Sequence, residues 1–136
     1  MTQDNDLRPR RSVLYMPGAN ERALEKAKTL PADALILDLE DAVAPDAKIE
    51  ARARVCAAAA SGEYGTKEIT IRANGLDTSW HADDLRAIAE AGPAAVVVPK
   101  INSVSDVAAV EKALEAGGAP DHTKICLLYT SPSPRD

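Results

Sequence analysis

The chain has 136 residues, and its 21 acidic side chains outnumber the 16 basic ones, which gives a formal net charge of −5. This length predicts a single domain, and the acidic balance argues against nucleic acid or an anionic membrane surface as the main partner, because both require a basic face. No apolar run approaches the roughly 18–20 residues of a membrane-spanning helix, and residues 1–11 lack the apolar stretch of a signal peptide. The two cysteines are too few for a disulfide framework or a metal cluster, so we expect a reduced, cytoplasmic domain.

Short strand-like runs alternate with longer helical stretches along the chain. An apolar run at residues 12–16 predicts the first strand, and Asn20 is a suitable N-cap for a helix over residues 21–29. The run ALILDL at 34–39 is nearly continuous in apolar side chains, which is typical of a strand buried on both faces. The later expected elements are a helix at 45–60, a strand at 68–73, a helix at 81–91, a strand at 94–98, a helix from Ser103 or Ser105 to residue 116, and the start of a strand at 123–125.

The expected strands begin near residues 12, 34, 68, 94 and 123, a spacing that is typical of repeated βα units. Such repeats build a parallel sheet, either an open doubly wound sheet or the eight-stranded barrel. At the spacing of these four and a half units, eight units would occupy about 250 residues, which is the usual size of a complete barrel. The predicted fold is therefore α/β, the N-terminal half of a (β/α)8 TIM barrel. It has about four βα units plus the start of a fifth strand over residues 11–125, after a flexible N-terminus at 1–10.

The last eleven residues, 126–136 (CLLYTSPSPRD), depart abruptly from the Ala-, Val- and Glu-rich composition before them. One interpretation is a strand end followed by a Ser- and Pro-rich tail, which is common at termini. The segment also matches, residue for residue, the translation in one frame of a transposase-type sequencing adapter. We expect residues 126–136 to be such an artefact, with the genuine sequence cut within an open frame after Ile125.

Ionisable side chains gather where the expected strands end, which is where sites lie in parallel α/β folds. Asp38, Glu40 and Asp41 follow the second strand. They form either a solvated acidic loop or a group of carboxylates that holds a cation or pairs with an arginine; Mg²⁺, for example, is bound by one or two carboxylates together with substrate oxygens. Arg72 ends the third strand, where a buried guanidinium needs a carboxylate partner. That partner is either a substrate carboxylate or, in a structural pair, Glu40 or Asp41.

Other polar side chains carry weaker signals. Lys26 is an ordinary surface lysine on the sequence pattern alone, and Pro17-Gly18 is either a turn or a close backbone approach to a ligand. His81 and His122 lack the spacing of a zinc site. Cys56 lies between apolar residues of an expected helix, which favours a core position over a nucleophile. The sequence contains no Gly-rich phosphate loop and no nucleophile elbow.

Two motifs in this order are specific enough to indicate a protein family: DLEDAVAP at residues 38–45 and IRANGLDT at 71–78. They are accompanied by RSVLYMPG at 11–18, Ala51-Arg52 and VPK at 98–100. Together these segments resemble the HpcH/HpaI aldolase/citrate lyase β-subunit family over residues 11–125. The NGLDT segment is most similar to the corresponding segment of malyl-CoA lyases, and citrate lyase β subunits and citramalyl-CoA lyases are nearly as similar.

The resemblance implies a (β/α)8 barrel that cleaves or forms a carbon–carbon bond beside a coenzyme A (CoA) thioester, with Mg²⁺ as the cofactor. The family's arginine at the position of Arg72 binds the carboxylate of the keto-acid or hydroxyacyl substrate. The family's residues at Tyr15 and Lys26 help to hold the CoA portion. Glu40 and Asp41 are implied to lie in the site, where they orient Arg72 or water around the metal. The catalytic candidates are thus Arg72, Glu40 and Asp41, and the cofactor-binding candidates are Tyr15 and Lys26.

The family's two Mg²⁺ ligands, a glutamate and an aspartate, come from the fifth and sixth strands. The resemblance therefore implies that both lie beyond the end of this chain, with the glutamate expected shortly after the position of Ile125. Malyl-CoA lyases often carry an arginine where this chain has Asn20. The resulting hypothesis is a fragment, itself inactive, of a homo-oligomeric Mg²⁺-dependent lyase that acts on a malyl-CoA, citramalyl-CoA or citryl-CoA type of thioester. One alternative is a class II pyruvate-type aldolase of the same superfamily, which takes a keto acid without CoA. The other is a non-catalytic accessory half-barrel whose open sheet edges pair with another half.

Overall fold

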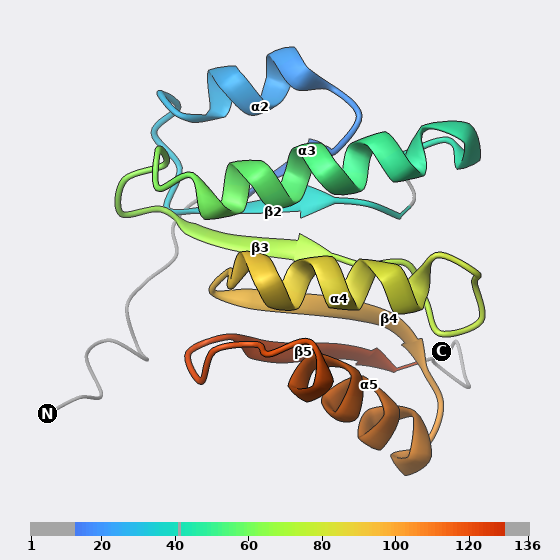
Figure 1. Ribbon diagram of the computed structural model, residues 1–136. Coiled ribbons are helices and arrows are strands. Elements are labelled where there is room, and N and C mark those ends of the chain that lie inside the picture. The colour runs from blue at the N-terminus through green and yellow to red at the C-terminus, as the bar shows by residue number, and fades with distance from the viewer. Residues whose placement is uncertain (1–12, 41, 130–136) are drawn as a thin grey trace, which may run out of the picture.

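The computed structural model describes residues 13–40 and 42–129, and its strands form one parallel sheet in the order β1-β2-β3-β4-β5 (Figure 1). The strands are β1 (Val13–Pro17), β2 (Ala34–Asp38), β3 (Glu68–Arg72), β4 (Ala95–Ile101) and β5 (Lys124–Tyr129). The helices are α2 (Glu21–Ala27), α3 (Lys48–Ala60), α4 (His81–Ala91) and α5 (Val104–Ala116), with a short 3-10 helix η1 (Pro45–Ala47) before α3. None of the helices in these described ranges is long and apolar enough to cross a membrane.

The order of the strands decides between the two arrangements that the sequence leaves open. Every neighbouring pair is parallel and consecutive along the chain. In a doubly wound sheet the strand order reverses, whereas a (β/α)8 barrel adds each strand beside the preceding one. The predicted α/β half-barrel, with four βα units and a fifth strand, is therefore confirmed.

The helices cover one face of the sheet, and the core lies between them and the strands (Figure 1). Successive side chains of a strand point to opposite faces, and Leu35 and Leu37 of β2 are fully buried on the helical side. The opposite face, which we call the inner face, carries Tyr15, Ile36 and Thr70 side by side in register. Tyr15 is 59% exposed there. The strand ends on this side therefore border a face of the sheet that the helices do not cover.

Local signals at the ends of elements are also confirmed. The side chain of Asn20 caps α2 by accepting a hydrogen bond from the Ala23 amide at 2.9 Å, and Ser103 caps α5. Gly18 makes the close backbone approach that is one of its two expected roles, but it approaches another segment of the protein and not a ligand. Its amide donates to the Asp38 carbonyl at 2.8 Å, and a Cβ at this position would lie 2.7 Å from that oxygen. Glycine therefore allows the end of β1 to pack against the end of β2.

Two strands run further than their sequence patterns predict. Strand β4 continues beyond its expected end at Pro99. An irregularity of the register between Val98 and Ile101 accommodates this proline, which has no backbone N–H donor. Strand β5 crosses the expected boundary after residue 125, and Cys126 pairs with Val97 of β4. Strand pairing does not reveal where a segment originates, so the adapter origin of residues 126–136 stays a prediction. The expected flexible N-terminus at 1–10 lies outside the described residues.

Candidate active site at the carboxyl ends of the strands

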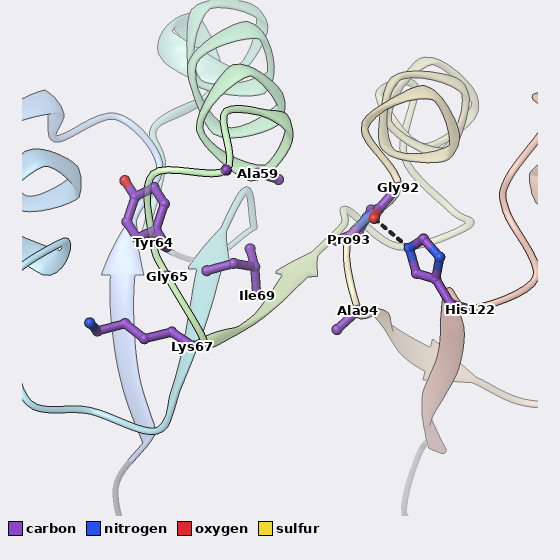
Figure 2. Close-up of a pocket in the computed structure, with 10 residues that line it drawn as sticks. Ala59, Tyr64, Gly65, Lys67, Ile69, Gly92, Pro93, Ala94 and His122 are labelled. Carbon is purple, nitrogen blue, oxygen red and sulfur yellow. Dashed lines mark hydrogen bonds between the residues drawn. The ribbon is translucent and has the colours of Figure 1, made fainter. Parts of the chain in front are cut away.

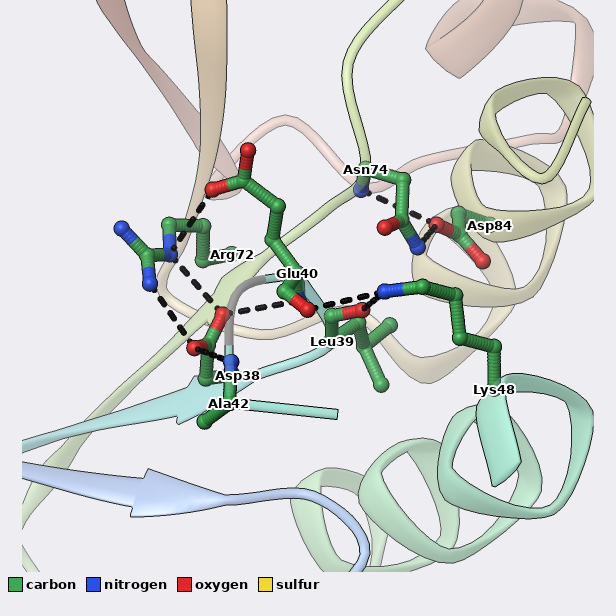
Figure 3. Close-up of polar contacts among 8 residues, drawn as sticks. All are labelled: Asp38, Leu39, Glu40, Ala42, Lys48, Arg72, Asn74 and Asp84. Atoms are coloured by element: carbon green, nitrogen blue, oxygen red, sulfur yellow. Dashed lines mark hydrogen bonds and ion pairs between the residues drawn. The ribbon is translucent and has the colours of Figure 1, made fainter. Parts of the chain in front are cut away.

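The centre of the candidate site is an ion pair between Asp38 and Arg72 (Figure 3). The register of β2 and β3 places these two strand-end residues opposite each other. Arg72 donates from Nε to Oδ1 and from Nη2 to Oδ2 of Asp38, both at 2.8 Å. This two-point contact fixes the plane of the guanidinium group. The geometry of that group matches a carboxylate, which it binds through two parallel hydrogen bonds.

The loop after β2 wraps around the same carboxylate. The backbone amide of Glu40 donates to Oδ1 of Asp38 at 2.9 Å, and the amide of Ala42 donates to Oδ2 at 3.1 Å. Burial would raise the pKa of Asp38, but the hydrogen bonds from Arg72 and the two amides outweigh it and hold this pKa below its ordinary value. Asp38 is therefore a carboxylate at neutral pH, and it links the loop to the arginine.

Two further side chains contact Arg72. A carboxylate oxygen of Glu40 lies 3.5 Å from Nε, and the ring centroid of Tyr15 lies 5.6 Å from Cζ. The second contact is a cation–π interaction between β1 and β3, which lie on either side of β2. The Arg72 side chain is only 18% exposed, although it lies on the open inner face. Asp38, Glu40 and Tyr15 thus hold the guanidinium in one orientation before any substrate arrives.

A buried lysine supports the loop from its other side (Figure 3). Lys48, the first residue of α3, donates from Nζ to the carbonyl oxygens of Leu39 at 2.9 Å and of Glu40 at 2.8 Å. Its ammonium group also lies 5.1 Å from the ring centroid of Trp80. The Lys48 residue is only 6% exposed.

A second polar network fixes the loop after β3. Asp84 of α4, which is fully buried, accepts from Nε of Arg52 at 2.8 Å. Its other oxygen accepts from the backbone amide of Asn74 at 3.0 Å and from its side-chain amide at 2.7 Å. Nδ1 of His81 lies 2.8 Å from the Asn74 carbonyl oxygen. This network joins α3, α4 and the β3–α4 loop, so it holds the segment that follows Arg72.

The structure brings together three of the candidate residues that the sequence predicts: Tyr15, Glu40 and Arg72. Asp41 lies outside the described residues. Lys26 lies in the last turn of α2 with its side chain exposed, so it does not join this group.

The sequence predicts Glu40 or Asp41 as the structural partner of Arg72, whereas in the structure Asp38 makes the two-point contact with it. The alternation of the strands is the signal that could have found it, because Asp38 and Arg72 each lie two residues after an inner-face side chain. Lys48 was missed as well, and a lysine at the start of a helix carries no comparable signal.

The described residues do not provide a metal site of their own. Among them, no group of three or more His, Cys, Asp or Glu side chains could hold a metal ion. Both oxygens of Asp38 already accept hydrogen bonds from Arg72 and from backbone amides, so this carboxylate does not fit a Mg²⁺ ligand. Cys56 is also unsuited to chemistry, since burial, reinforced by the Asp84 carboxylate, raises the pKa of its thiol to about 11.

The opposite end of the sheet has a cavity of about 250 Å³ that could be mistaken for the site (Figure 2). It lies where β3, β4 and β5 begin, because Lys67, Ala94 and His122 line it. Nε2 of His122 lies 2.9 Å from the Gly92 carbonyl oxygen, and Nζ of Lys67 donates to the Lys28 carbonyl at 3.2 Å. These polar groups connect loops to each other, and (β/α)8 barrels place their chemistry at the other end of the strands. We therefore place the candidate site at the carboxyl ends.

Comparisons with known proteins agree with this placement of the chain in a half-barrel. It is 52% identical over 102 residues to a (3S)-malyl-CoA thioesterase of Cereibacter sphaeroides, covering 75% of this chain and 36% of the relative. It is 36% identical over 135 residues to citrate lyase subunit beta of Escherichia coli, covering 96% of this chain and 45% of the relative. An L-malyl-CoA/beta-methylmalyl-CoA lyase of C. sphaeroides is 38% identical over 112 residues, with 80% and 35% covered. The chain thus spans between a third and a half of the length of these curated relatives.

Solved structures show the same fold. The protein CitE of Mycobacterium tuberculosis, in complex with magnesium and acetoacetate, matches with a TM-score of 0.66 and 28% identity over 93% of this chain and 47% of that chain. Haloferax volcanii malate synthase has a TM-score of 0.75 at 19% identity, covering 92% and 42%, and supports the fold alone. The model of the HpcH/HpaI aldolase/citrate lyase family matches residues 11–128. The strand order and the position of Arg72 at the strand ends agree with this match. Because the family model covers most of the chain, the chain belongs to the HpcH/HpaI aldolase/citrate lyase family.

Proposed function

We propose that this chain forms the carboxylate-binding half of a Mg²⁺-dependent carbon–carbon lyase that acts on a CoA thioester of a hydroxydicarboxylic acid of the malyl-CoA type. The observation that carries the proposal is the orientation of Arg72, which Asp38, Glu40 and Tyr15 hold at the carboxyl end of β3. The names of relatives that are 52% and 38% identical include malyl-CoA, which supports this substrate class.

The role of the chain's own residues follows from this geometry. Arg72 binds the free carboxylate of the substrate from the inner face, and Asp38 keeps the guanidinium in the required plane. A carboxylate held in this way places the neighbouring carbon–carbon bond at a fixed position, which reduces the entropy that must be lost on the way to the transition state.

Related structures support the cofactor part of the proposal. CitE of M. tuberculosis has been crystallised with magnesium, acetoacetate and coenzyme A, at 28% identity to this chain. A bound Mg²⁺ ion supplies Lewis-acid polarisation of a substrate oxygen. Because the described residues do not fit a magnesium site, we propose that its ligands lie outside them.

Thioester hydrolysis is a second candidate, favoured by the 52% identity to (3S)-malyl-CoA thioesterase. The two reactions differ in the bond that breaks. In the lyase reaction the substrate hydroxyl loses its proton, the carbon–carbon bond breaks to release glyoxylate, and the acetyl-CoA enolate takes up a proton. In hydrolysis, water adds to the thioester carbonyl and the CoA thiol leaves, which gives malate. Binding of the carboxylate by Arg72 serves both reactions equally.

The test is an incubation of the complete enzyme with (3S)-malyl-CoA and Mg²⁺, with glyoxylate and free CoA thiol measured in the same sample. We expect glyoxylate to form without an equal amount of free thiol. Free thiol without glyoxylate would replace the lyase proposal by the thioesterase. Neither product, with an enzyme that binds CoA, would contradict both candidates.

The 136-residue chain alone provides a matching experiment. We expect no turnover of malyl-CoA by this chain, because its inner face is open and its described residues do not fit the metal. Turnover comparable to that of the complete enzyme would contradict this proposal of an inactive fragment.

A further inference from the structure

Glu40 is held at three points, and one of them is a buried lysine. Its backbone amide donates to Oδ1 of Asp38 at 2.9 Å, its carboxylate lies 3.5 Å from Nε of Arg72, and its carbonyl oxygen accepts from Nζ of Lys48 at 2.8 Å. The preceding carbonyl, that of Leu39, accepts from the same ammonium group at 2.9 Å. The carbonyl oxygen of Glu40 is thus held on the helical side by Lys48, and its side chain is held on the inner face by Arg72.

Burial of the Lys48 ammonium group is costly unless its donors are satisfied. Two carbonyl oxygens and the Trp80 ring, whose centroid is 5.1 Å away, provide favourable contacts at this position. A lysine on the outer side of α3 would keep its hydration at no such cost. The position of the charge under the loop after β2 therefore points to a role in setting the geometry of that loop.

We propose that Lys48 is a positioning residue that sets the carboxylate-binding geometry of Arg72 through Glu40; this inference rests on the proposed role of Arg72. Without the ammonium group, the carbonyls of Leu39 and Glu40 turn away to find other donors. The Glu40 amide then leaves Asp38, and its carboxylate leaves Nε of Arg72. The guanidinium loses its fixed orientation, while Lys26, the CoA-binding candidate in α2, lies outside this network.

The experiment uses the complete enzyme, with acetoacetate in the presence of Mg²⁺ as a probe for the carboxylate site and free CoA as a second probe. Calorimetry gives both affinities. Lys48→Met should weaken acetoacetate binding by roughly tenfold, since small misplacements of binding groups have large effects, and should leave CoA affinity within about twofold of wild type. Lys67→Met is the matched control, because Lys67 also donates to a backbone carbonyl, at 3.2 Å, but at the opposite end of the sheet. We expect both of its affinities to stay at wild-type values.

Each remaining outcome has a definite meaning. Acetoacetate affinity that is unchanged in Lys48→Met, or an equal loss of both affinities, would overturn the positioning role. Arg72→Met tests the proposed function separately: if it binds acetoacetate as the wild type does, the carboxylate role of Arg72 fails whatever Lys48 does. If Lys48→Met does not fold, Lys48→Gln, which keeps one donor near the two carbonyls, replaces it. A smaller split in the same direction is then expected, because the neutral amide only partly replaces the ammonium group, and the absence of any split would overturn the proposal.

Discussion

Two arginine–aspartate pairs of the same chemistry lie in different surroundings in this molecule. Arg72–Asp38 and Arg52–Asp84 each have an N–O contact of 2.8 Å, and both aspartates are buried. The first pair connects two strands and borders the open inner face. The second connects α3 and α4 behind the sheet, where Asp84 also accepts two hydrogen bonds from Asn74. Position, rather than pair chemistry, is therefore what favours the proposed ligand-binding role for Arg72 and a structural role for Arg52.

The largest expected effect concerns the stability of the structural pair. Asp84→Ala leaves Nε of Arg52 and both Asn74 amide groups without their acceptor. Removal of one partner of a buried pair costs about 3–5 kcal/mol. We expect the free energy of unfolding of the complete enzyme, measured in urea, to fall by that amount. A loss below about 1 kcal/mol, which is typical of an exposed pair, would show that the network contributes little to stability.

Arg72→Met should have its main effect on the reaction. Loss of a hydrogen-bonded charge that holds a substrate carboxylate costs about 3 kcal/mol, or roughly 100-fold in kcat/KM for malyl-CoA. Arg54→Met is the control, since Arg54 is a surface arginine whose Nη1 donates to the Ala19 carbonyl at 3.3 Å. If kcat/KM of Arg72→Met stays within twofold of the control, Arg72 is a structural residue like Arg52.

Asp38→Asn tests the ionic character of the site pair through pH. Because hydrogen bonds hold the pKa of Asp38 below its ordinary value, the unfolded chain binds this proton more readily than the folded one. The stabilisation is complete above the ordinary aspartate pKa of about 3.9 and is lost as the pH falls through the lower folded pKa. We therefore expect Asp38→Asn to be less stable than wild type by about 1–3 kcal/mol at pH 7.

The pH dependence of that difference is the decisive measurement. Urea unfolding of wild type and Asp38→Asn at a series of pH values should show the two stabilities converging as the pH falls below about 4. Carboxyl groups that do not contact Arg72 titrate in both proteins and cancel from the comparison. A difference that stays constant with pH would mean that the charge of Asp38 does not stabilise the fold.

The fold could be predicted from the sequence because its signals are local. The runs at 12–16 and 34–39 and the cap at Asn20 each specify an element within a few residues, and repetition of the unit specifies a parallel sheet. The end of β4 was not predicted, because a bulge depends on the neighbouring strand as well as on Pro99.

The site could be predicted only as a group of strand ends. Arg72 was identified by its unusual place in a strand, whereas its pairing with Asp38 depends on a register between segments 34 residues apart. Asp84 has the sequence pattern of an acid in the first turn of a helix, and only packing of α4 against α3 buries it. Lys48 likewise acquires its partners from a loop that folds back on the helix start.

The smallest expected effect separates two roles of Tyr15. If its ring mainly supports Arg72, Tyr15→Leu removes a cation–π contact worth about 0.5–1 kcal/mol and weakens acetoacetate binding by roughly threefold, while Tyr15→Phe keeps the ring and the affinity. Calorimetry with acetoacetate and with free CoA measures both. We expect the acetoacetate effect, because the ring centroid lies 5.6 Å from Cζ of Arg72. A loss of CoA affinity alone would assign Tyr15 to the CoA portion, and would leave Arg72 oriented by Asp38 and Glu40 without help from β1.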